Sequence, residues 1–343
     1  MLASVTMAFW FTDSIRLWRF ASFLPEQNSL STKHRYKKLV RFLDSINFDL
    51  SFWKNYIKFL FSLPYFRLKQ RKYISIVIDF TTLKDDFLVL LATVSFRGRG
   101  IPIYLKLWKD PNKKYDFWGR VENFLRDLFE ILPKRFRYEI IADRGFQGDK
   151  FLEICLEFGF DYIVRINGNY IVHVGDEKYV QLCMFSPGVY YDLYIGRNSS
   201  VKSNLVVNEI EGEGKERLRW YLRTNLRDRE RVVRDYQRRM WIEEGVKDLK
   251  SYLRWESYTE KIPEKGRLEK MVVISILSYV IGLCIGSREE SIEGIEEDKK
   301  REEGLYRRFI NIVRASIDRA SRFILTVIVL TIQKYYMLWK IFP

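Results

Sequence analysis

Histidine and cysteine are scarce in this chain of 343 residues, which holds two histidines and three cysteines. The cysteines, Cys155, Cys183 and Cys284, show no Cys-x2-Cys spacing, so neither a zinc knuckle nor a disulfide framework is expected and the compartment is predicted to be reducing. With only His34 and His173 available, histidine catalysis and histidine-rich metal sites are not expected. Any bound metal should have carboxylate ligands, which favours magnesium or manganese.

Long hydrophobic runs are missing as well. Met271–Gly286 has 16 residues, whereas a membrane-spanning helix needs about 20. Phe323–Ile332 is shorter still, so both are expected to be buried core helices, with a membrane-associated protein as the less favoured alternative. Met1–Trp10 is apolar, but Asp13 follows and no signal-peptide cleavage site is evident. The chain is therefore expected to be cytoplasmic, with no membrane partner.

Positive charge is plentiful. Lys and Arg number 59 against 44 Asp and Glu, a net charge of +15. Residues 1–72 hold 13 Lys and Arg against four acids, an excess of nine. Such a segment suits DNA, because neutralising phosphates releases condensed counterions; a merely solvated surface and an anionic membrane are the alternatives. Abundant Lys, Glu and Ile with scarce Gln are typical of a thermophilic prokaryote.

In residues 73–166, apolar runs typical of strands alternate with segments whose apolar residues recur at helical spacing. This pattern predicts alternating strands and helices. The β-branched run Tyr73–Phe80 predicts a buried strand, and Arg97–Gly100 is typical of a hairpin turn. The expected order is three strands, helix, strand, helix, strand, in the ranges 73–80, 86–96, 101–108, 115–132, 138–142, 149–158 and 162–166. This order predicts an α/β fold with a ribonuclease-H-like mixed sheet flanked by helices.

The rest of the chain has a different character. In residues 168–225, short strand-like runs alternate with Gly, Asn and Ser turns, which predicts an all-β insertion, and a long helix is expected from about Asp228 to Leu253. Residues 287–304 are densely charged, which predicts a solvated loop before C-terminal helices. The expected parts are a basic helical DNA-binding region at 1–72, a catalytic domain at 73–167 and 226–286, the β-rich insertion at 168–225, and a charged loop with C-terminal helices at 287–343.

Two aspartates follow apolar strands. Asp79 comes at the end of the run that starts at Tyr73, and Asp143 directly follows the run 138–142. An ionised carboxylate beside a core strand is costly unless a positive charge binds it. Neighbouring strand ends would bring both acids to one edge of the sheet, where such folds place their ligands. The alternative is that each aspartate only caps a following turn.

A third carboxylate lies in the long predicted helix. Tyr236, Arg239, Glu243 and Lys250 are separated by 3, 4 and 7 positions. In a continuous helix these spacings place all four on one stripe. The stripe offers an acid for a metal, two cations for phosphate and a phenol. The alternative is an ordinary surface ion pair between Arg239 and Glu243.

The spacing Tyr-x2-Arg-x3-Glu-x6-Lys resembles the signature of DDE transposases of the insertion-sequence-four family, and all four positions match. Asp79-x-Thr81 and the motif Asp-Arg-Gly-Phe at 143–146 are similar to that family too, as is a β-rich segment before the helix that carries Glu243. The resemblance covers residues 73–285.

By this resemblance the chain is an enzyme of cut-and-paste DNA transposition, which cleaves transposon ends and joins the freed 3′-hydroxyl to target DNA. Asp79, Asp143 and Glu243 would be its catalytic residues and the ligands of two Mg²⁺ or Mn²⁺ ions, because two ions can hold both the attacking and the leaving oxygen. The implied partners are double-stranded DNA, at transposon ends and target, and a second copy in a homodimer that pairs the ends. The implied location is the nucleoid of a prokaryote.

The resemblance also implies DNA contacts. Arg239 and Lys250 would hold phosphates, Tyr236 would contact a terminal phosphate, and Arg144 of the second motif is also assigned to DNA. Some family members flip a base onto an aromatic residue. Trp220 is the candidate for this stacking and Trp241 its rival, with core packing as the alternative for either.

Other functions stay open at this point. The chain could be a metal-dependent nuclease of the same fold or a catalytically inactive DNA-binding relic. Glu244, beside Glu243, is an alternative third carboxylate, although its helical phase is off the stripe by about 100°. No standard helix-turn-helix is recognised in residues 1–72.

Overall fold

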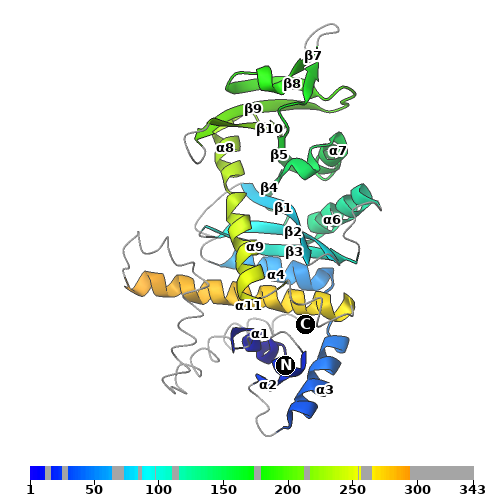
Figure 1. Cartoon of the computed structure of the whole chain (residues 1–343), viewed down its shortest axis with the longest axis vertical. Helices are drawn as coiled ribbons and strands as arrows, with labels where there is room; N and C mark the ends of the chain where they lie inside the picture. Colours follow the sequence, from blue (N-terminus) through cyan, green and yellow to red (C-terminus); the bar gives the residue numbers. More distant parts are fainter. Residues whose placement is uncertain are drawn as a thin grey trace. The chain divides into compact units, whose positions relative to one another are not determined.

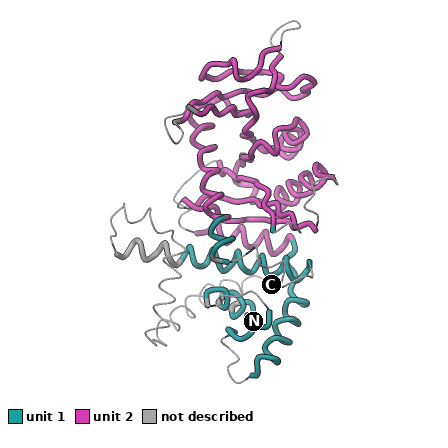
Figure 2. The backbone as a smooth tube through the Cα atoms, in the orientation of Figure 1, with its two compact units in different colours: residues 1–49, 83–86, 247–343 teal, residues 50–82, 87–246 magenta. Residues whose placement is uncertain are grey.

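The computed structural model describes residues 1–11, 17–24, 30–63, 73–83, 87–96, 98–109, 116–173, 179–211, 217–253, 255 and 265–293. The chain divides into two compact units (Figure 2): a first unit of residues 1–49, 83–86 and 247–343, and a second unit of residues 50–82 and 87–246. The predicted C-terminal helices beyond 305 and the run Phe323–Ile332 lie outside the described residues.

The first unit is helical. Its elements include α1 (Leu2–Phe11), α2 (Leu17–Ser22), α3 (Thr32–Ser45) and α11 (Lys265–Glu293). α3 begins after Ser31, whose side chain accepts a hydrogen bond from the His34 amide and so caps this basic helix. Arg267 on α11 pairs with Asp44 at the end of α3 (2.7 Å).

The apolar run Met271–Gly286 forms the middle of α11. Every residue from Met271 to Val280 is buried, which agrees with the predicted core helix. Among the described residues, no helix is long and apolar enough to cross a membrane. α11 continues to Glu293, so residues 287–293 are helical where the sequence predicts a loop. The physical reason is that a helix extends readily once its first turns have formed.

The second unit is built on a mixed sheet. Five strands follow the predicted order: β1 (Tyr73–Leu83), β2 (Phe87–Phe96), β3 (Arg99–Trp108), β4 (Arg137–Ala142) and β5 (Asp161–Ile166). Their spatial order is β3-β2-β1-β4-β5. β2 and β3 are antiparallel, whereas β4 is parallel to both β1 and β5. This is a mixed α/β fold compatible with the ribonuclease-H-like fold.

Three helices cover one face of these strands: α4 (Leu50–Ser62), α6 (Phe117–Ile131) and α7 (Asp149–Glu157). Figure 1 shows α6 and α7 on one side of the sheet and α8 on the other. α6 buries an apolar stripe that includes Val121, Phe124 and Leu128. The Trp53 ring of α4 meets Tyr104 of β3 edge-on, with ring centroids 5.5 Å apart. α4 therefore packs with the sheet of the second unit, although the sequence assigns it to the basic region 1–72.

Residues 168–225 extend the same sheet. They form β6 (Ile171–His173), β7 (Tyr179–Gln181), β8 (Gly188–Ile195), β9 (Lys202–Glu211) and β10 (Arg217–Thr224). β10 pairs antiparallel with β5, and the order continues β9-β8-β6-β7 to give ten strands. The segment is thus continuous with the core sheet, because β10 satisfies the backbone groups on the free edge of β5.

The long helix predicted from Asp228 to Leu253 is interrupted. The structure has α8 (Arg229–Gln237) and α9 (Met240–Tyr252). Between them the amides of residues 238, 239, 241 and 242 bond to carbonyls three residues earlier, which is the tighter 3₁₀ pattern. The prediction of one continuous helix is therefore wrong, although Arg239 in the junction still lies beside both Tyr236 and Glu243.

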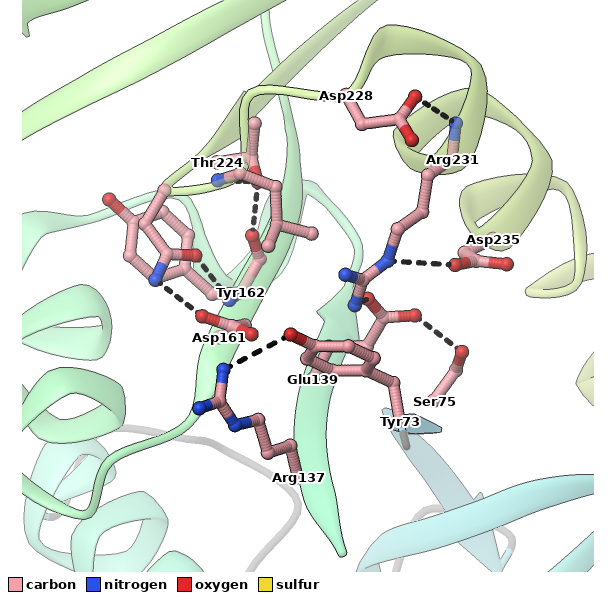
Figure 3. Close-up of polar contacts among 12 residues, drawn as sticks. Tyr73, Ser75, Arg137, Glu139, Asp161, Tyr162, Thr224, Asp228, Arg231 and Asp235 are labelled. Carbon is pink, nitrogen blue, oxygen red and sulfur yellow. Dashed lines mark hydrogen bonds and ion pairs between the residues drawn. The ribbon is translucent and has the colours of Figure 1, made fainter. Parts of the chain in front are cut away.

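A buried polar network ties α8 to the sheet (Figure 3). Arg231 of α8 donates to Glu139 of β4 (2.6 Å) and lies 3.5 Å from Asp235. Ser75 of β1 also donates to Glu139, and the Arg231 guanidinium lies 4.0 Å from the centre of the Tyr73 ring. Glu139 is fully buried. This network fixes α8 over the first residues of β1 and β4.

Candidate active site

Asp79 lies on β1, on the same face as Val77. Val77 belongs to a core cluster that also contains Val232 and Tyr236 of α8 and Ile242 of α9, so this face is the one that α8 covers. β1 continues to Leu83, and the prediction that Asp79 ends its strand is therefore wrong. One carboxylate oxygen of Asp79 accepts a hydrogen bond from the Phe80 amide (2.8 Å), and the side chain is 29% exposed.

Asp143 directly follows β4, as the sequence predicts. Because β4 is the parallel neighbour of β1, Asp143 comes near Asp79. Its Oδ1 accepts a hydrogen bond from the Gly145 amide (2.8 Å). Asp143 thereby caps the short 3₁₀ helix η2 (Arg144–Phe146). The turn-capping interpretation thus accounts for one oxygen of Asp143.

Arg239 brings the third carboxylate to the other two. It sits in the 3₁₀ junction between α8 and α9. Its Nη2 lies 2.5 Å from Glu243 Oε1, and its Nη1 lies 3.9 Å from Asp79 Oδ2. Burial acts to lower the pKa of Arg239, but Tyr236 and the three carboxylates raise it above its ordinary value. The guanidinium is therefore held charged among acids.

The pKa of Asp79 reflects its burial and its charged neighbours. Burial is the largest cause that raises its pKa, to about 6, and the charge of Asp143 adds to the rise. Arg239 and the Phe80 amide oppose it, whereas Glu243 raises it slightly further. Arg239 therefore does not offset the combined effect of burial and of the neighbouring carboxylates on Asp79. A perturbed carboxylate of this kind is a frequent property of functional sites.

α9 (Met240–Tyr252) packs closely against β3 where two glycines, Gly245 and Gly100, face each other. A Cβ atom on Gly245 would lie 2.6 Å from the Gly100 carbonyl oxygen, and one on Gly100 would lie 2.9 Å from the Ile242 Cα. Only glycine permits this approach. Beside it, Glu244 pairs with Arg99 of β3 (3.2 Å). The pair directs Glu244 toward β3, whereas Glu243, with a side chain 55% exposed, faces Arg239.

Tyr236 and Arg165 form a second part of the site. Tyr236 is 3% exposed, and its hydroxyl finds no hydrogen-bond partner of good geometry among the described residues. Burial raises its pKa, while the nearby guanidiniums of Arg239 and Arg165 lower it. Burial lowers the pKa of Arg165, Tyr236 raises it, and Arg144 adds repulsion. Arg165, Arg239 and Arg144 thus place positive charge around the buried Tyr236 ring. Among the described residues, no carboxylate forms an ion pair with Arg165.

Arg165 is a residue that the sequence analysis missed. It occupies β5, in the predicted strand 162–166, and interrupts an otherwise apolar run. A cation in a core strand is costly unless a partner or ligand compensates its charge. The sequence could therefore have indicated Arg165 as a candidate binding residue. Arg144, which the sequence assigns to DNA, is exposed on η2.

Two other predicted residues are placed differently. Trp220 of β10 is 8% exposed and belongs to the core cluster with Tyr236. The two rings meet edge-on at 5.1 Å, which is the core packing given as the alternative to base stacking; its rival Trp241 is only partly buried. Lys250 lies on α9 but belongs to the first unit, and the site of the second unit is built without it.

The carboxylates fit a divalent metal chemically. Their oxygens are the ligands that magnesium prefers, and burial, followed by the charge of Asp143, raises the pKa of Asp79. No three His, Cys, Asp or Glu side chains in the described part of the chain are gathered closely enough to hold an ion, and Arg239 contacts Asp79 and Glu243 instead. Metal binding would require Glu243 to rotate away from Arg239, which its exposure permits.

Comparison with known families adds an independent observation. Residues 121–280 match the family model of the transposase DDE domain. The matched segment is somewhat less than half of the chain and contains Asp143, Tyr236, Arg239, Glu243 and Lys250, while Asp79 lies ahead of it. No curated protein matches the chain. The family match supports a DDE transposase, a class of enzyme that cleaves and transfers DNA strands.

Proposed function

We propose that the protein is a cut-and-paste DNA transposase of the insertion-sequence-four type, with Asp79, Asp143 and Glu243 as its catalytic carboxylates. The observation that carries this proposal is that Arg239 lies between Asp79 of β1 and Glu243 of α9, while Asp143 follows β4, the parallel neighbour of β1. The match of residues 121–280 to the transposase DDE domain supports it.

The three carboxylates would hold divalent metal, on which DDE transposase domains generally depend. Two Mg²⁺ or Mn²⁺ ions would activate the attacking oxygen and stabilise the leaving oxygen of the phosphodiester. The protein's own part is to place Asp79 and Asp143 on adjacent parallel strands. Glu243 would become the third carboxylate ligand once its ion pair with Arg239 is broken. The freed guanidinium then binds a DNA phosphate in place of the carboxylate.

Tyr236, Arg165 and Arg144 would hold a phosphate next to the cleaved bond. The buried Tyr236 hydroxyl has a hydrogen bond to donate, and a phosphate oxygen beside Arg165 and Arg239 would accept it. The partly buried environment strengthens these interactions because water screens them little. For Trp220 we propose support of the Tyr236 ring in place of base stacking, and for Lys250 a contact with DNA phosphate.

The partners in this proposal are double-stranded DNA and a second copy of the chain. A homodimer would pair two transposon ends, and the same carboxylates would then direct each 3′-hydroxyl at the target phosphodiester. The exposed lysines of α3 would contribute phosphate contacts outside the cleavage site.

The test uses purified protein, Mg²⁺ and DNA that carries the inverted repeats flanking the gene. We expect cleavage at the repeat ends and joining to a target plasmid. Glu243→Gln should abolish both, whereas Glu244→Gln, the neighbouring glutamate paired with Arg99, should retain cleavage within about threefold, since surface ion pairs contribute little.

Other outcomes would select the alternatives. Sequence-independent cleavage without joining would identify a nuclease of the same fold. Tight binding of the repeats without cleavage in Mg²⁺ or Mn²⁺ would identify an inactive DNA-binding protein. Equal loss of cleavage in Glu243→Gln and Glu244→Gln would contradict the assignment of Glu243.

A further inference from the structure

Four exposed side chains form one row across the outer strands of the sheet. Tyr179 of β7 is the direct partner of His173 on β6, His173 is the partner of Tyr194 on β8, and Tyr194 is the partner of Lys202 on β9. Directly paired residues point to the same face of a sheet. Tyr179, His173, Tyr194 and Lys202 are here called the Tyr-His-Tyr-Lys row.

The row faces solvent. Tyr179 is 50% exposed and Tyr194 is 37% exposed, and His173 and Lys202 are exposed as well. Their neighbours on the opposite face, Val172 and Ile195, are 0% and 1% exposed. The strands are therefore anchored by apolar residues on one face, and the row is not needed to fill a core.

The row also belongs to the face that carries the candidate active site. On β9, Lys202 shares its face with Val206, because residues four apart on a strand point the same way. Val206 packs in the core cluster with Trp220 and Tyr236. The face covered by α8 near the site thus continues as the Tyr-His-Tyr-Lys row. Figure 1 draws no described α-helix over β6, β7 and β8 on this face.

The chemistry of the row suits unpaired bases. The His173 and Tyr179 rings lie 5.2 Å apart, and the Lys202 ammonium lies 5.5 Å from the centre of the Tyr194 ring. Aromatic rings on an open sheet offer flat surfaces for base stacking, and an adjacent cation binds the phosphate between bases. An apolar protein partner would find few aliphatic side chains in this row.

We propose that the Tyr-His-Tyr-Lys row is a binding surface for a single strand of DNA. Tyr179, His173 and Tyr194 would stack on bases, and Lys202 would bind the backbone between them. This surface is separate from the carboxylates and does not need them, so it can be tested without metal and independently of the proposed cleavage activity.

The first measurement is affinity. The full chain in EDTA is titrated into a fluorescein-labelled single strand of about 20 nucleotides and fluorescence anisotropy is followed. The double variant His173→Ala/Tyr194→Ala should bind at least about tenfold more weakly, since each stacked base contributes strongly. Tyr191→Ala removes a more exposed tyrosine of β8 outside the row and should bind like the wild type.

The second measurement locates the contact. A single strand containing 5-iodouracil is irradiated with the wild-type protein, and cross-linked peptides are mapped by mass spectrometry. Cross-links at Tyr179 or Tyr194 support the proposal. Cross-links only outside the row, together with unchanged affinity in the double variant, overturn it, as does a change of oligomeric state in the double variant with unchanged affinity for the strand. Glu243→Gln should bind the strand normally even if it loses cleavage.

Discussion

When no DNA is bound, Arg239 is the cation that lies among the three carboxylates of the site. It offsets part of the negative charge that Asp79, Asp143 and Glu243 bring together, yet the pKa of Asp79 stays raised to about 6. An arrangement that is unfavourable for the free protein and useful for binding a cation is typical of functional sites. Substitution at such residues should therefore change stability and activity in opposite directions.

Asp79→Asn should stabilise the fold while it abolishes cleavage. The folded pKa of Asp79 (about 6) lies above its ordinary value of 3.8, so wild-type stability falls as pH rises between these values. The asparagine side chain carries no charge and so removes this loss. We expect the free energy of unfolding to rise by about 1–2 kcal/mol at pH 8 after solvent screening, and by less at pH 5. Urea denaturation at both pH values measures it.

The matched control is Asp192→Asn, an exposed aspartate 3.7 Å from Arg227. Its stability should change by less than about 0.5 kcal/mol. A loss of stability in Asp79→Asn at pH 8 would contradict the electrostatic account of the site.

Tyr236→Phe should leave stability unchanged or raise it. The buried hydroxyl has no good hydrogen bond among the described residues, so its removal relieves a desolvated group, by up to about 1 kcal/mol. Binding of a cleaved DNA end should weaken about tenfold, because the hydroxyl would be a phosphate donor. Tyr162→Phe is the control: its buried hydroxyl bonds to Ser203 (2.9 Å), and its loss should cost about 1 kcal/mol. Equal stability changes in the two variants would contradict this prediction.

At the scale of elements, the position of α9 decides whether Glu243 reaches the strands. The helix approaches β3 through Gly100 and Gly245, and α8 is held on β1 and β4 by Arg231. The 3₁₀ junction lies between these two anchors and presents Arg239 to the carboxylates. Each anchor can be disturbed without touching a catalytic side chain.

Gly245→Ala should displace α9. The added methyl would lie 2.6 Å from the Gly100 carbonyl oxygen, a backbone atom that cannot move away alone. We expect a loss of about 1–3 kcal/mol in unfolding free energy and a large loss of cleavage. Gly266→Ala, in α11 with nothing within 4 Å of the added atom, should be neutral or slightly stabilising. Normal activity of Gly245→Ala would show that the glycine contact does not position Glu243.

Arg231→Ala should destabilise the second unit in a pH-dependent way. Burial, and then the charge of Asp235, raise the pKa of Glu139 to about 7 even with Arg231 present. Wild-type stability therefore falls as pH rises from the ordinary value of 4.5 to about 7. Without Arg231 the pKa rises further, so we expect a loss of about 3 kcal/mol at pH 8 and less at pH 5.5.

Arg234→Ala provides the comparison for this network. Arg234 also approaches Asp235 (3.5 Å), but its side chain is 61% exposed. Its removal should change the unfolding free energy by less than about 1 kcal/mol at either pH. If the two arginine variants lost the same stability, the buried pair with Glu139 would not be the cause.

At the scale of the whole molecule, the net charge of +15 governs how the protein meets DNA. The second unit carries the carboxylates, and α3 of the first unit presents four exposed cations: Lys33, Lys37, Lys38 and Arg41. Their substitution by alanine should weaken duplex binding. It should also reduce the slope of log affinity against log salt, by about 0.9 for each phosphate that is no longer neutralised.

The measurement is anisotropy with a labelled duplex between about 50 and about 200 mM salt, where counterion release changes the affinity strongly. The control replaces two exposed lysines elsewhere, Lys150 and Lys265, and should keep most of the slope. An unchanged slope in the α3 variant would mean that this helix does not bind DNA. Thermal unfolding should be unaffected, because all four side chains are exposed.

Local patterns alone determined much of this protein. The period of the hydrophobic residues predicts the order from β1 to β5, because side-chain alternation is set by backbone geometry. Asp143 directly after β4 and Ser31 at the start of α3 follow from the same local rules. The basic character of α3 is visible in the residues themselves.

Only the tertiary structure decided how the site is assembled. The 3₁₀ junction at Arg239 lies between α8 and α9, which contact different strands through Arg231 and Gly245. No local pattern carries that information, since the partners Glu139 and Gly100 lie about a hundred residues away along the chain or more. The same holds for Arg165 and Tyr236, which meet only when β5 is covered by α8, and for the Tyr-His-Tyr-Lys row, which depends on strand register.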